Sequence, residues 1–197
     1  MKLIKQIPED EMIAEFLRAE INSTRFGKDI IDALKRKKKS KDIVTNPDLS
    51  NNSENQLREE LLREVREEFF ENFPDDIKWY KAIIQKQELK KVKYIDYSYS
   101  NELSDKTRSP IQAAKNINTG VKIFGVSNKH YFEILTAINK GKKIPAMIFV
   151  AKNKKSRIVV LEGHARLTAY FLNEKNIPKS MKIIIGYSKN ITKWNLY

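Results

Sequence analysis

Cysteine is absent from the 197 residues of the chain, and this absence removes several classes of chemistry. Without thiols the chain can form neither disulfides nor thiolate metal sites, a composition typical of a cytoplasmic protein. Histidine is almost as scarce: His130 and His164 lie 34 positions apart and outside any zinc-binding pattern. Motifs for nucleophilic triads, Walker-type phosphate loops and dinucleotide binding are also missing. The sequence thus excludes thiol chemistry and gives no support to a zinc enzyme.

Long hydrophobic runs are missing as well. A membrane-spanning helix needs roughly 20 consecutive apolar residues, and no run approaches that length although 41% of the residues are hydrophobic. The first residues, MKLIKQIPEDEM, lack the apolar segment of a secretory signal peptide. We therefore expect a cytoplasmic protein without a membrane partner. Its length indicates one medium domain with an appendage, or two small domains.

Positive charge is concentrated in the second half of the chain. The net charge is +13, and residues 77–197 contain 24 Lys and Arg but only 7 Asp and Glu. Residues 53–76 are acidic by contrast, with 3 basic and 9 acidic side chains. An excess of positive charge raises the local concentration of anionic ligands, and phosphorylated metabolites and nucleic acid both fit that description. Charge alone does not choose between them.

The first 90 residues are predicted to form a helical region. Pro8 and the acidic residues after it are typical of a helix start, and apolar residues then recur at three- to four-residue spacing. Ser53 and Gln56 have the spacing of a capping box at the start of a longer helix. We predict helices over residues 8–21, 29–39, 53–72 and 74–86.

The second half is predicted to mix strands and helices, which makes the whole chain α+β. Short β-branched and aromatic runs are typical of strands, and apolar residues at helical spacing between Pro or Ser starts and Gly ends are typical of helices. We predict strands over residues 92–97, 144–150, 158–161 and 181–187, and helices over residues 110–118, 128–139 and 164–172. A polar loop is expected over residues 98–108 and a hairpin over residues 152–156.

Residues 158–172, IVVLEGHARLTAYFL, are the most informative stretch. A strand that turns through Gly163 directly into a helix points free backbone N–H groups and the positive end of the helix dipole at the turn, which makes an anion site. Arg166 can offer a guanidinium fork to a phosphate, and Glu162 can serve a cation or a proton transfer. Strand–Gly–helix junctions are also common without any ligand. A single His or Arg at such a place is often a hydrogen-bonding or solvent-facing residue.

Residues 162–169, EGHARLTA, resemble the phosphate-binding signature of the ParB/sulfiredoxin superfamily. In that superfamily the turn from Gly to Arg holds nucleotide phosphates, such as those of ATP or CTP. The resemblance covers roughly residues 92–187. It implies a ParB/sulfiredoxin-like nucleotide-binding domain over residues 91–197, built on a small mixed sheet with helices, after a helical region over residues 1–90.

Departures from the family pattern narrow this implication. Sulfiredoxin needs a nucleophilic Cys in the motif, whereas position 164 is His. Partition ParB proteins carry several arginines here and a helix-turn-helix domain downstream, whereas this chain has only Arg166 and 31 residues after it. The order acidic–Gly–His–x–Arg is closest to free-serine kinases and to uncharacterised ParB-like proteins.

The candidate site follows from the motif and the resemblance together. The residues expected at the phosphates are Gly163, His164, Arg166, Thr168 and, from the start of the helix at residue 110, Arg108. Catalytic roles would fall to Glu162 and His164, with Glu162 as a base or as a ligand of nucleotide-bound Mg²⁺. The expected cofactor is ATP, ADP or CTP. The loop that carries Arg108 is equally compatible with an ordinary surface loop.

Two classes of function remain open. The first is a phosphotransferase or nucleotide hydrolase, in which positioning and charge stabilisation supply most of the catalysis. The second is a non-catalytic binding module, which senses a nucleotide or associates with DNA through the basic run Lys35–Lys41 and the basic C-terminal half. That run is also typical of a solvated helix end. A nuclease receives no support, because the sequence shows no carboxylate cluster for two metal ions.

Overall fold

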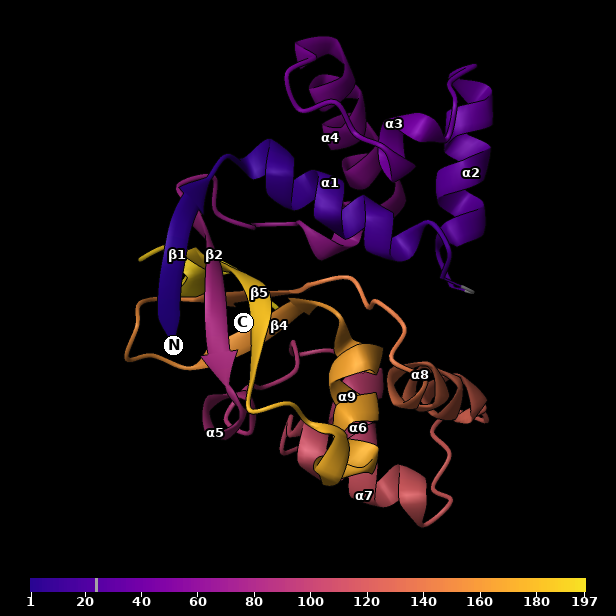
Figure 1. The fold of residues 1–197 in the computed structure, drawn as a ribbon, viewed down its shortest axis with the longest axis vertical. Helices are drawn as coiled ribbons and strands as arrows, with labels where there is room; N and C mark the ends of the chain where they lie inside the picture. The colour runs from indigo at the N-terminus through magenta and orange to yellow at the C-terminus, as the bar shows by residue number, and fades with distance from the viewer. Residues whose placement is uncertain (24) are drawn as a thin grey trace.

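A five-stranded sheet separates two groups of helices in the computed structural model, which describes residues 1–23 and 25–197 (Figure 1). The strands are β1 (Lys2–Ile7), β2 (Lys78–Gln85), β3 (Met147–Ala151), β4 (Ile158–Glu162) and β5 (Ser180–Tyr187). Their order in the sheet is β1-β2-β5-β3-β4. The β3–β5 pair is parallel and the other neighbours are antiparallel, so the sheet is mixed.

The helices divide by sequence into two layers, one on each side of the sheet (Figure 1). The first layer contains α1 (Glu9–Glu20), α2 (Gly27–Arg36), α3 (Asp42–Thr45) and α4 (Asn52–Arg66). The second contains α5 (Lys86–Leu89), α6 (Ser98–Leu103), α7 (Pro110–Asn118), α8 (Lys129–Asn139) and α9 (His164–Leu172). Short 3-10 turns lie at Glu67–Phe69, Glu174–Asn176 and Ile191–Lys193. None of the helices in the described part of the chain is both long and apolar enough to cross a membrane.

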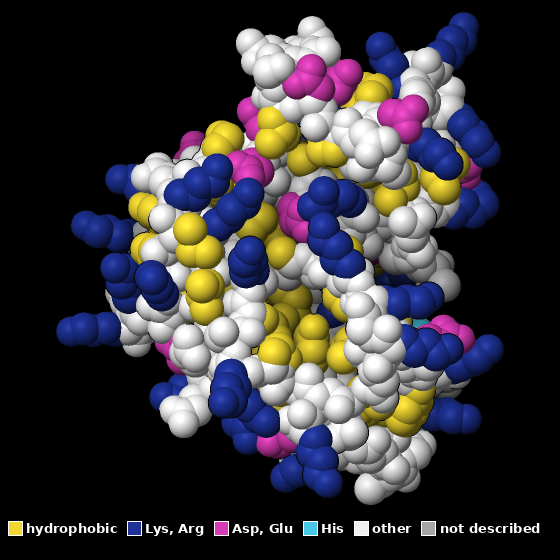
Figure 2. Space-filling view, in the orientation of Figure 1, with side chains coloured by type: hydrophobic (Ala, Val, Ile, Leu, Met, Phe, Trp, Pro, Cys, Tyr) yellow, Lys and Arg dark blue, Asp and Glu magenta, His cyan; other side chains and the backbone are white. Residues whose placement is uncertain are grey.

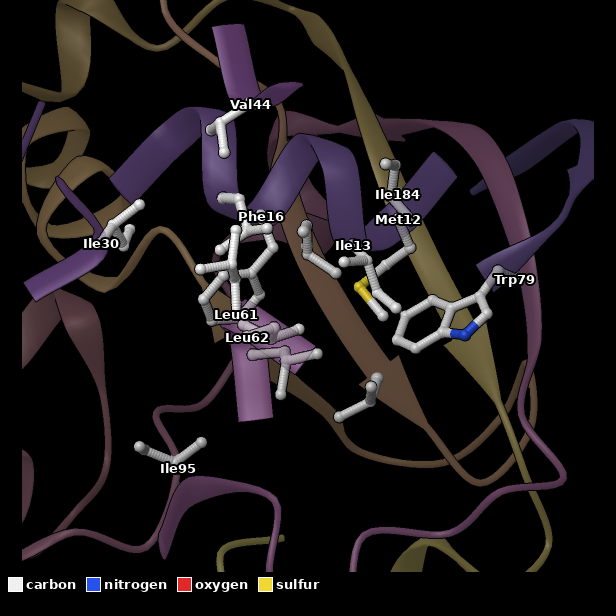
Figure 3. Close-up of a cluster of buried hydrophobic side chains, with 14 of the residues drawn as sticks. Met12, Ile13, Phe16, Ile30, Val44, Leu61, Leu62, Trp79, Ile95 and Ile184 are labelled. Carbon is white, nitrogen blue, oxygen red and sulfur yellow. The ribbon is translucent and has the colours of Figure 1, made fainter. Parts of the chain in front are cut away.

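Each face of the sheet contributes to a separate core, because side chains along a strand alternate between the two faces. In β5, Ile184 faces the first helical layer, whereas Ile183 and Ile185 face the second. The first core includes Met12, Phe16, Leu61 and Trp79, which Figure 3 shows gathered between α1, α4 and the sheet. The second core includes Ala113, Ile117, Phe149, Leu167 and Phe171.

The motif region folds as the sequence predicts. The strand at residues 158–162, the turn at Gly163 and the helix at residues 164–172 are all confirmed. The predicted helices over residues 110–118 and 128–139 and the final strand are confirmed as well. The long helix differs from its prediction at both ends. In place of the expected capping box of Ser53 and Gln56, Asn51 caps it by accepting a hydrogen bond from the Glu54 N–H at 3.2 Å, and the helix spans Asn52–Arg66 instead of residues 53–72.

Three predictions about secondary structure are wrong. Residues 78–85, expected in a helix, form β2 and pair with β5 along their whole length. Residues 92–97, expected in a strand, contribute only one bridge, between Lys93 and Val159. The expected loop after them contains α6. In such short apolar runs the local spacing of apolar residues fits a helix as well as a strand. A pairing partner far away in the sequence decides which of the two forms.

The first 90 residues are consequently not wholly helical. They supply β1, which the sequence analysis missed, and β2, and they join a sheet whose other strands come from residues 147–187. β1 is an edge strand with a register irregularity between Leu3 and Lys5. The coarse α+β class is confirmed, and one sheet includes residues from both sides of position 90.

A buried arginine fixes the loop between α3 and α4. The Arg58 side chain on α4 is fully buried. Its guanidinium donates to the carbonyl oxygens of Ile43 at 2.9 Å and Asp48 at 3.0 Å, and Glu54 lies at 3.3 Å. This one side chain therefore supplies donors to carbonyl groups of α3 and of the loop after it, and joins both to α4.

Replacing Arg58 by Met should lower the free energy of unfolding by about 2–4 kcal/mol, because the volume is kept but the network of hydrogen bonds from this buried guanidinium is lost. The matched control is Arg63→Met on the same helix, where an exposed i,i+4 pair with Glu59 is lost. That control should change stability by no more than about 0.5 kcal/mol. Urea unfolding of the two variants checks the difference, and equal midpoints would contradict a structural role for Arg58.

Candidate functional site

Gly163 makes the turn between β4 and α9 in a conformation that other residues rarely adopt. Its φ is +103°, in the left-handed region. A Cβ at this position would lie 2.7 Å from the Met147 Cγ atom, so the turn also packs directly against β3. Backbone conformation and packing therefore both require glycine here.

The first turn of α9 offers unpaired backbone donors. The first intrahelical hydrogen bond runs from the Leu167 N–H to the Gly163 carbonyl at 2.8 Å. The N–H groups of His164, Ala165 and Arg166 precede it, and such groups find no acceptor within their own helix. His164 and Ala165 are half-buried and reach the surface, whereas Gly163 is buried. An anion would therefore meet this helix start at His164 and Ala165.

Arg166 lies inside the protein and contacts other protein groups. The residue is only 9% exposed. Its guanidinium donates to the Pro145 carbonyl at 2.7 Å and the Ala146 carbonyl at 3.2 Å, and it also donates to the Glu162 carboxylate. These contacts tie the start of α9 to the segment that leads into β3. Direct contact between Arg166 and a phosphate stays a prediction.

Glu162 is equally enclosed, at 5% exposure. The pKa of its carboxyl is raised to about 7. Burial is the main cause and the charge of Glu20 adds to it, while Arg166 acts in the opposite direction. The structure pairs one oxygen of this carboxylate with the Arg166 guanidinium. Among the described residues, no group of three or more acidic or His side chains is placed to hold a metal ion. The roles of base and Mg²⁺ ligand stay predictions.

Tyr94 and Thr168 contact His164 and hold it in place. The Tyr94 ring stacks on the imidazole with centroids 5.9 Å apart. The Tyr94 hydroxyl donates to Thr168 Oγ1 at 2.5 Å, and that hydroxyl in turn donates to the His164 carbonyl at 2.8 Å. Thr168 is 1% exposed, so it supports the helix start and does not reach the surface.

The His164 imidazole is neutral near physiological pH. Burial, together with the charges of Arg66, Arg25 and Arg166, lowers its pKa to about 3. The Nε2 atom is buried and has no hydrogen-bond partner among the described residues. A buried polar atom without a partner is uncommon and calls for a ligand or a water molecule.

Arg108 uses its guanidinium to bind backbone carbonyl groups. Its guanidinium donates to the Tyr94 carbonyl at 2.7 Å, the Tyr197 carbonyl at 3.0 Å and the Leu196 carbonyl at 3.2 Å. These bonds fasten the C-terminal residues to the segment before α6. Arg108 thus supports His164 indirectly, because it binds the Tyr94 carbonyl and the Tyr94 ring stacks on the imidazole.

Sequence reasoning missed two arginines that face the same region. Arg25, just before α2, and Arg66, at the end of α4, both lie over the Phe26 ring, with centroid distances of 4.9 and 3.9 Å. Both lower the pKa of His164. The sequence signals were Arg25 beside Phe26 and Arg66 three residues before Phe69, and these local pairs do not reveal that the two segments meet.

A larger cleft lies elsewhere in the molecule. It encloses about 530 Å³ between α1, the segment 45–49 and the sheet. Its lining carries charges of both signs, and Lys81 forms an ion pair with Glu11 and Arg18 with Glu15. None of the residues predicted from the motif lines this cleft. The candidate site is the start of α9, outside this cleft.

Comparison of the chain with protein-family models, with curated proteins and with solved structures gave no match in any of the three.

The Gly163 turn can be tested by adding a single methyl group. Gly163→Ala should cost about 1–2 kcal/mol for the left-handed conformation and about 1–3 kcal/mol more for the contact with Met147. Gly120→Ala is the matched control, since Gly120 also has a positive φ of +86° but nothing within 4 Å of its Cβ position. Thermal or urea unfolding should show the larger loss at Gly163. Combination with Met147→Ala should remove the excess, and an unchanged excess would contradict the packing argument.

Glu162 should make the stability fall as the pH rises. Because its folded-state pKa of about 7 lies above the ordinary value of 4.5, the folded chain holds this proton more tightly than the unfolded chain. Its contribution is fully present below pH 4.5 and is lost as the pH rises through 7. Relative to Glu162→Gln, wild type should lose about 2–3 kcal/mol of unfolding free energy over that interval. Urea titrations at closely spaced pH values provide the measurement. A constant difference between the two proteins would mean that Glu162 stays ionised beside Arg166.

Proposed function

We propose that this protein binds the phosphate group of a nucleotide, such as ATP, ADP or CTP, or of another phosphorylated small molecule, at the start of α9. The observation that carries the proposal is the left-handed Gly163 turn. After this turn the N–H groups of His164, Ala165 and Arg166 have no acceptor within α9, and the His164 Nε2 atom has no hydrogen-bond partner among the described residues. Backbone donors at the positive end of a helix are a standard anion-binding arrangement.

Two further observations support this proposal. The Glu162 carboxylate is turned inward onto Arg166, so it does not repel an anion at the surface of the turn. The arrangement strand–Gly–helix over residues 158–172 is also what the resemblance to the ParB/sulfiredoxin superfamily implies. We accordingly propose that residues 91–197 contain a ParB-like nucleotide-binding unit, which receives two additional strands from the first 90 residues.

The geometry supports a binding module more than a phosphotransferase or a nucleotide hydrolase. A general base must reach the proton that it removes, and the candidate base, Glu162, is 5% exposed and bonded to Arg166. His164 has an available ring nitrogen, yet its lowered pKa makes it a weak base.

DNA association receives less support than nucleotide binding. Within the basic run Lys35–Lys41, Lys35 pairs with Asp32 at 3.7 Å, and Lys37 pairs with Glu60 at 3.2 Å and Glu64 at 3.5 Å. These carboxylates reduce the charge that the run could offer to a phosphate backbone. On the face drawn in Figure 2, Lys and Arg side chains are scattered and not gathered into one stripe.

A matched pair of variants at Ala165 tests the proposal. Ala165→Glu places a carboxylate in the first turn of α9, where it favours the helix but repels a bound anion. Ala165→Gln adds a side chain of the same size without the charge. Titration calorimetry with inorganic phosphate, ATP, ADP and CTP, with and without Mg²⁺, should give binding in wild type and in Ala165→Gln. The Glu variant should bind at least about tenfold more weakly.

Two results would overturn the proposal. The first is that wild type binds none of these compounds at millimolar concentration. The second is that Ala165→Glu and Ala165→Gln bind equally well, which would place the anion elsewhere. Unfolding curves of both variants, recorded without ligand, show whether the fold is kept.

A further inference from the structure

Arg25 and Arg66 bring two guanidinium groups to one aromatic ring. Both lie over Phe26, and Arg66 also lies 4.4 Å from the centroid of Phe69. Arg25 lies 5.8 Å from the centroid of Tyr97, and its Nη2 donates to the Tyr97 hydroxyl at 3.3 Å. Aromatic faces attract each cation separately, but they do not cancel the repulsion between the two positive charges.

Neither arginine has a carboxylate partner among the described residues. Other arginines of the chain do have one: Arg18 pairs with Glu15, Arg63 with Glu59 and Arg166 with Glu162. Burial lowers the pKa of Arg66, the charges of Glu20 and Glu162 oppose this, and the charge of Arg25 adds to the lowering. The Nε atom of Arg66 is buried and has no hydrogen-bond partner among the described residues. A half-buried cation that shares an aromatic ring with a second cation and has an unused donor is unfavourable unless an anion binds to it.

The pair lies close to the segment that supports the start of α9. Tyr94 of that segment stacks on the His164 ring, and the charges of Arg25 and Arg66 both act on that ring. The His164 Nε2 atom, like the Arg66 Nε atom, is buried and has no hydrogen-bond partner among the described residues. Tyr97, which receives the bond from Arg25, immediately precedes α6 in the second helical layer. Figure 1 shows the end of α1 approaching the side of the molecule that carries α8 and α9. The arginines come from the first layer and the helix start from the second, so a ligand between them contacts both.

We propose that Arg25 and Arg66 form a second anion subsite beside the α9 turn. The preferred ligand then carries two or more linked phosphate groups, as in a nucleoside di- or triphosphate, and not one phosphate alone. One phosphate meets the N–H groups of the α9 turn, and the next meets the two guanidinium groups, whose planar forks suit phosphate oxygens. This inference rests on the proposed function, because the second subsite is defined by its place beside the phosphate site at α9.

Inorganic pyrophosphate and inorganic phosphate are the probes that separate the two subsites. Wild type should bind pyrophosphate at least about tenfold more tightly than phosphate in calorimetric titrations. Arg66→Met and Arg25→Met should each weaken pyrophosphate binding by about tenfold to a hundredfold and change phosphate binding by less than about threefold. Arg63→Met, three positions before Arg66 on α4 and exposed, should leave both affinities unchanged.

Stability without ligand provides the second readout. If Arg66 serves an absent anion, Arg66→Met removes an uncompensated charge, and the free energy of unfolding should stay the same or rise. A purely structural arginine would lower it. Equal affinity of wild type for pyrophosphate and phosphate, or undiminished pyrophosphate binding in both arginine variants, would overturn the second subsite while the α9 site stands. Failure of wild type to bind either probe would overturn the proposed function together with this inference.

Discussion

The pairing of β2 with β5 holds the two halves of the chain together. The two strands are antiparallel and in register from Lys78 opposite Tyr187 to Gln85 opposite Ser180. β2 follows the first helical layer in sequence, and β5 follows α9, so this one ladder places α1–α4 over one face of the sheet that carries the motif. Gly186 lies opposite Trp79, and a Cβ at Gly186 would be 2.6 Å from that indole. The contact leaves no room for a shift in register.

The position of the first helical layer over the sheet also affects the charge around the start of α9. Glu162 and Arg166 form an internal pair, and the first N–H groups of α9 have no acceptor within the helix. Burial is the main cause that keeps His164 neutral, and the charges of Arg25 and Arg66, from the first layer, add to it. The electrostatic character of the turn thus depends in part on residues 98 and 139 positions earlier in the chain, and the residues of the motif alone do not define it.

Sequence reasoning succeeded where local signals agree and failed where a distant partner decides. Residues 158–172 combine a β-branched run, a glycine and a helical spacing, and each of these points to the structure that forms. Residues 78–85 have apolar spacing that fits a helix as well as a strand, and only pairing with β5 makes them β2. Within the site, the turn could be predicted, because it is a local feature. The inward orientation of Arg166 could not, because it depends on carbonyl groups at residues 145 and 146.

The two edges of the sheet limit how this protein can assemble with others. β1 ends one side with exposed Lys2 and Lys5 and a break in its register, and lysines and irregularities of this kind discourage a further strand from adding. The outer side of β4 is covered where Lys93 exchanges backbone hydrogen bonds of 2.9 Å with Ile158 and Val160. Strand addition, which joins many proteins into extended sheets, is therefore disfavoured at both ends. Association with other molecules is left to helical and loop surfaces.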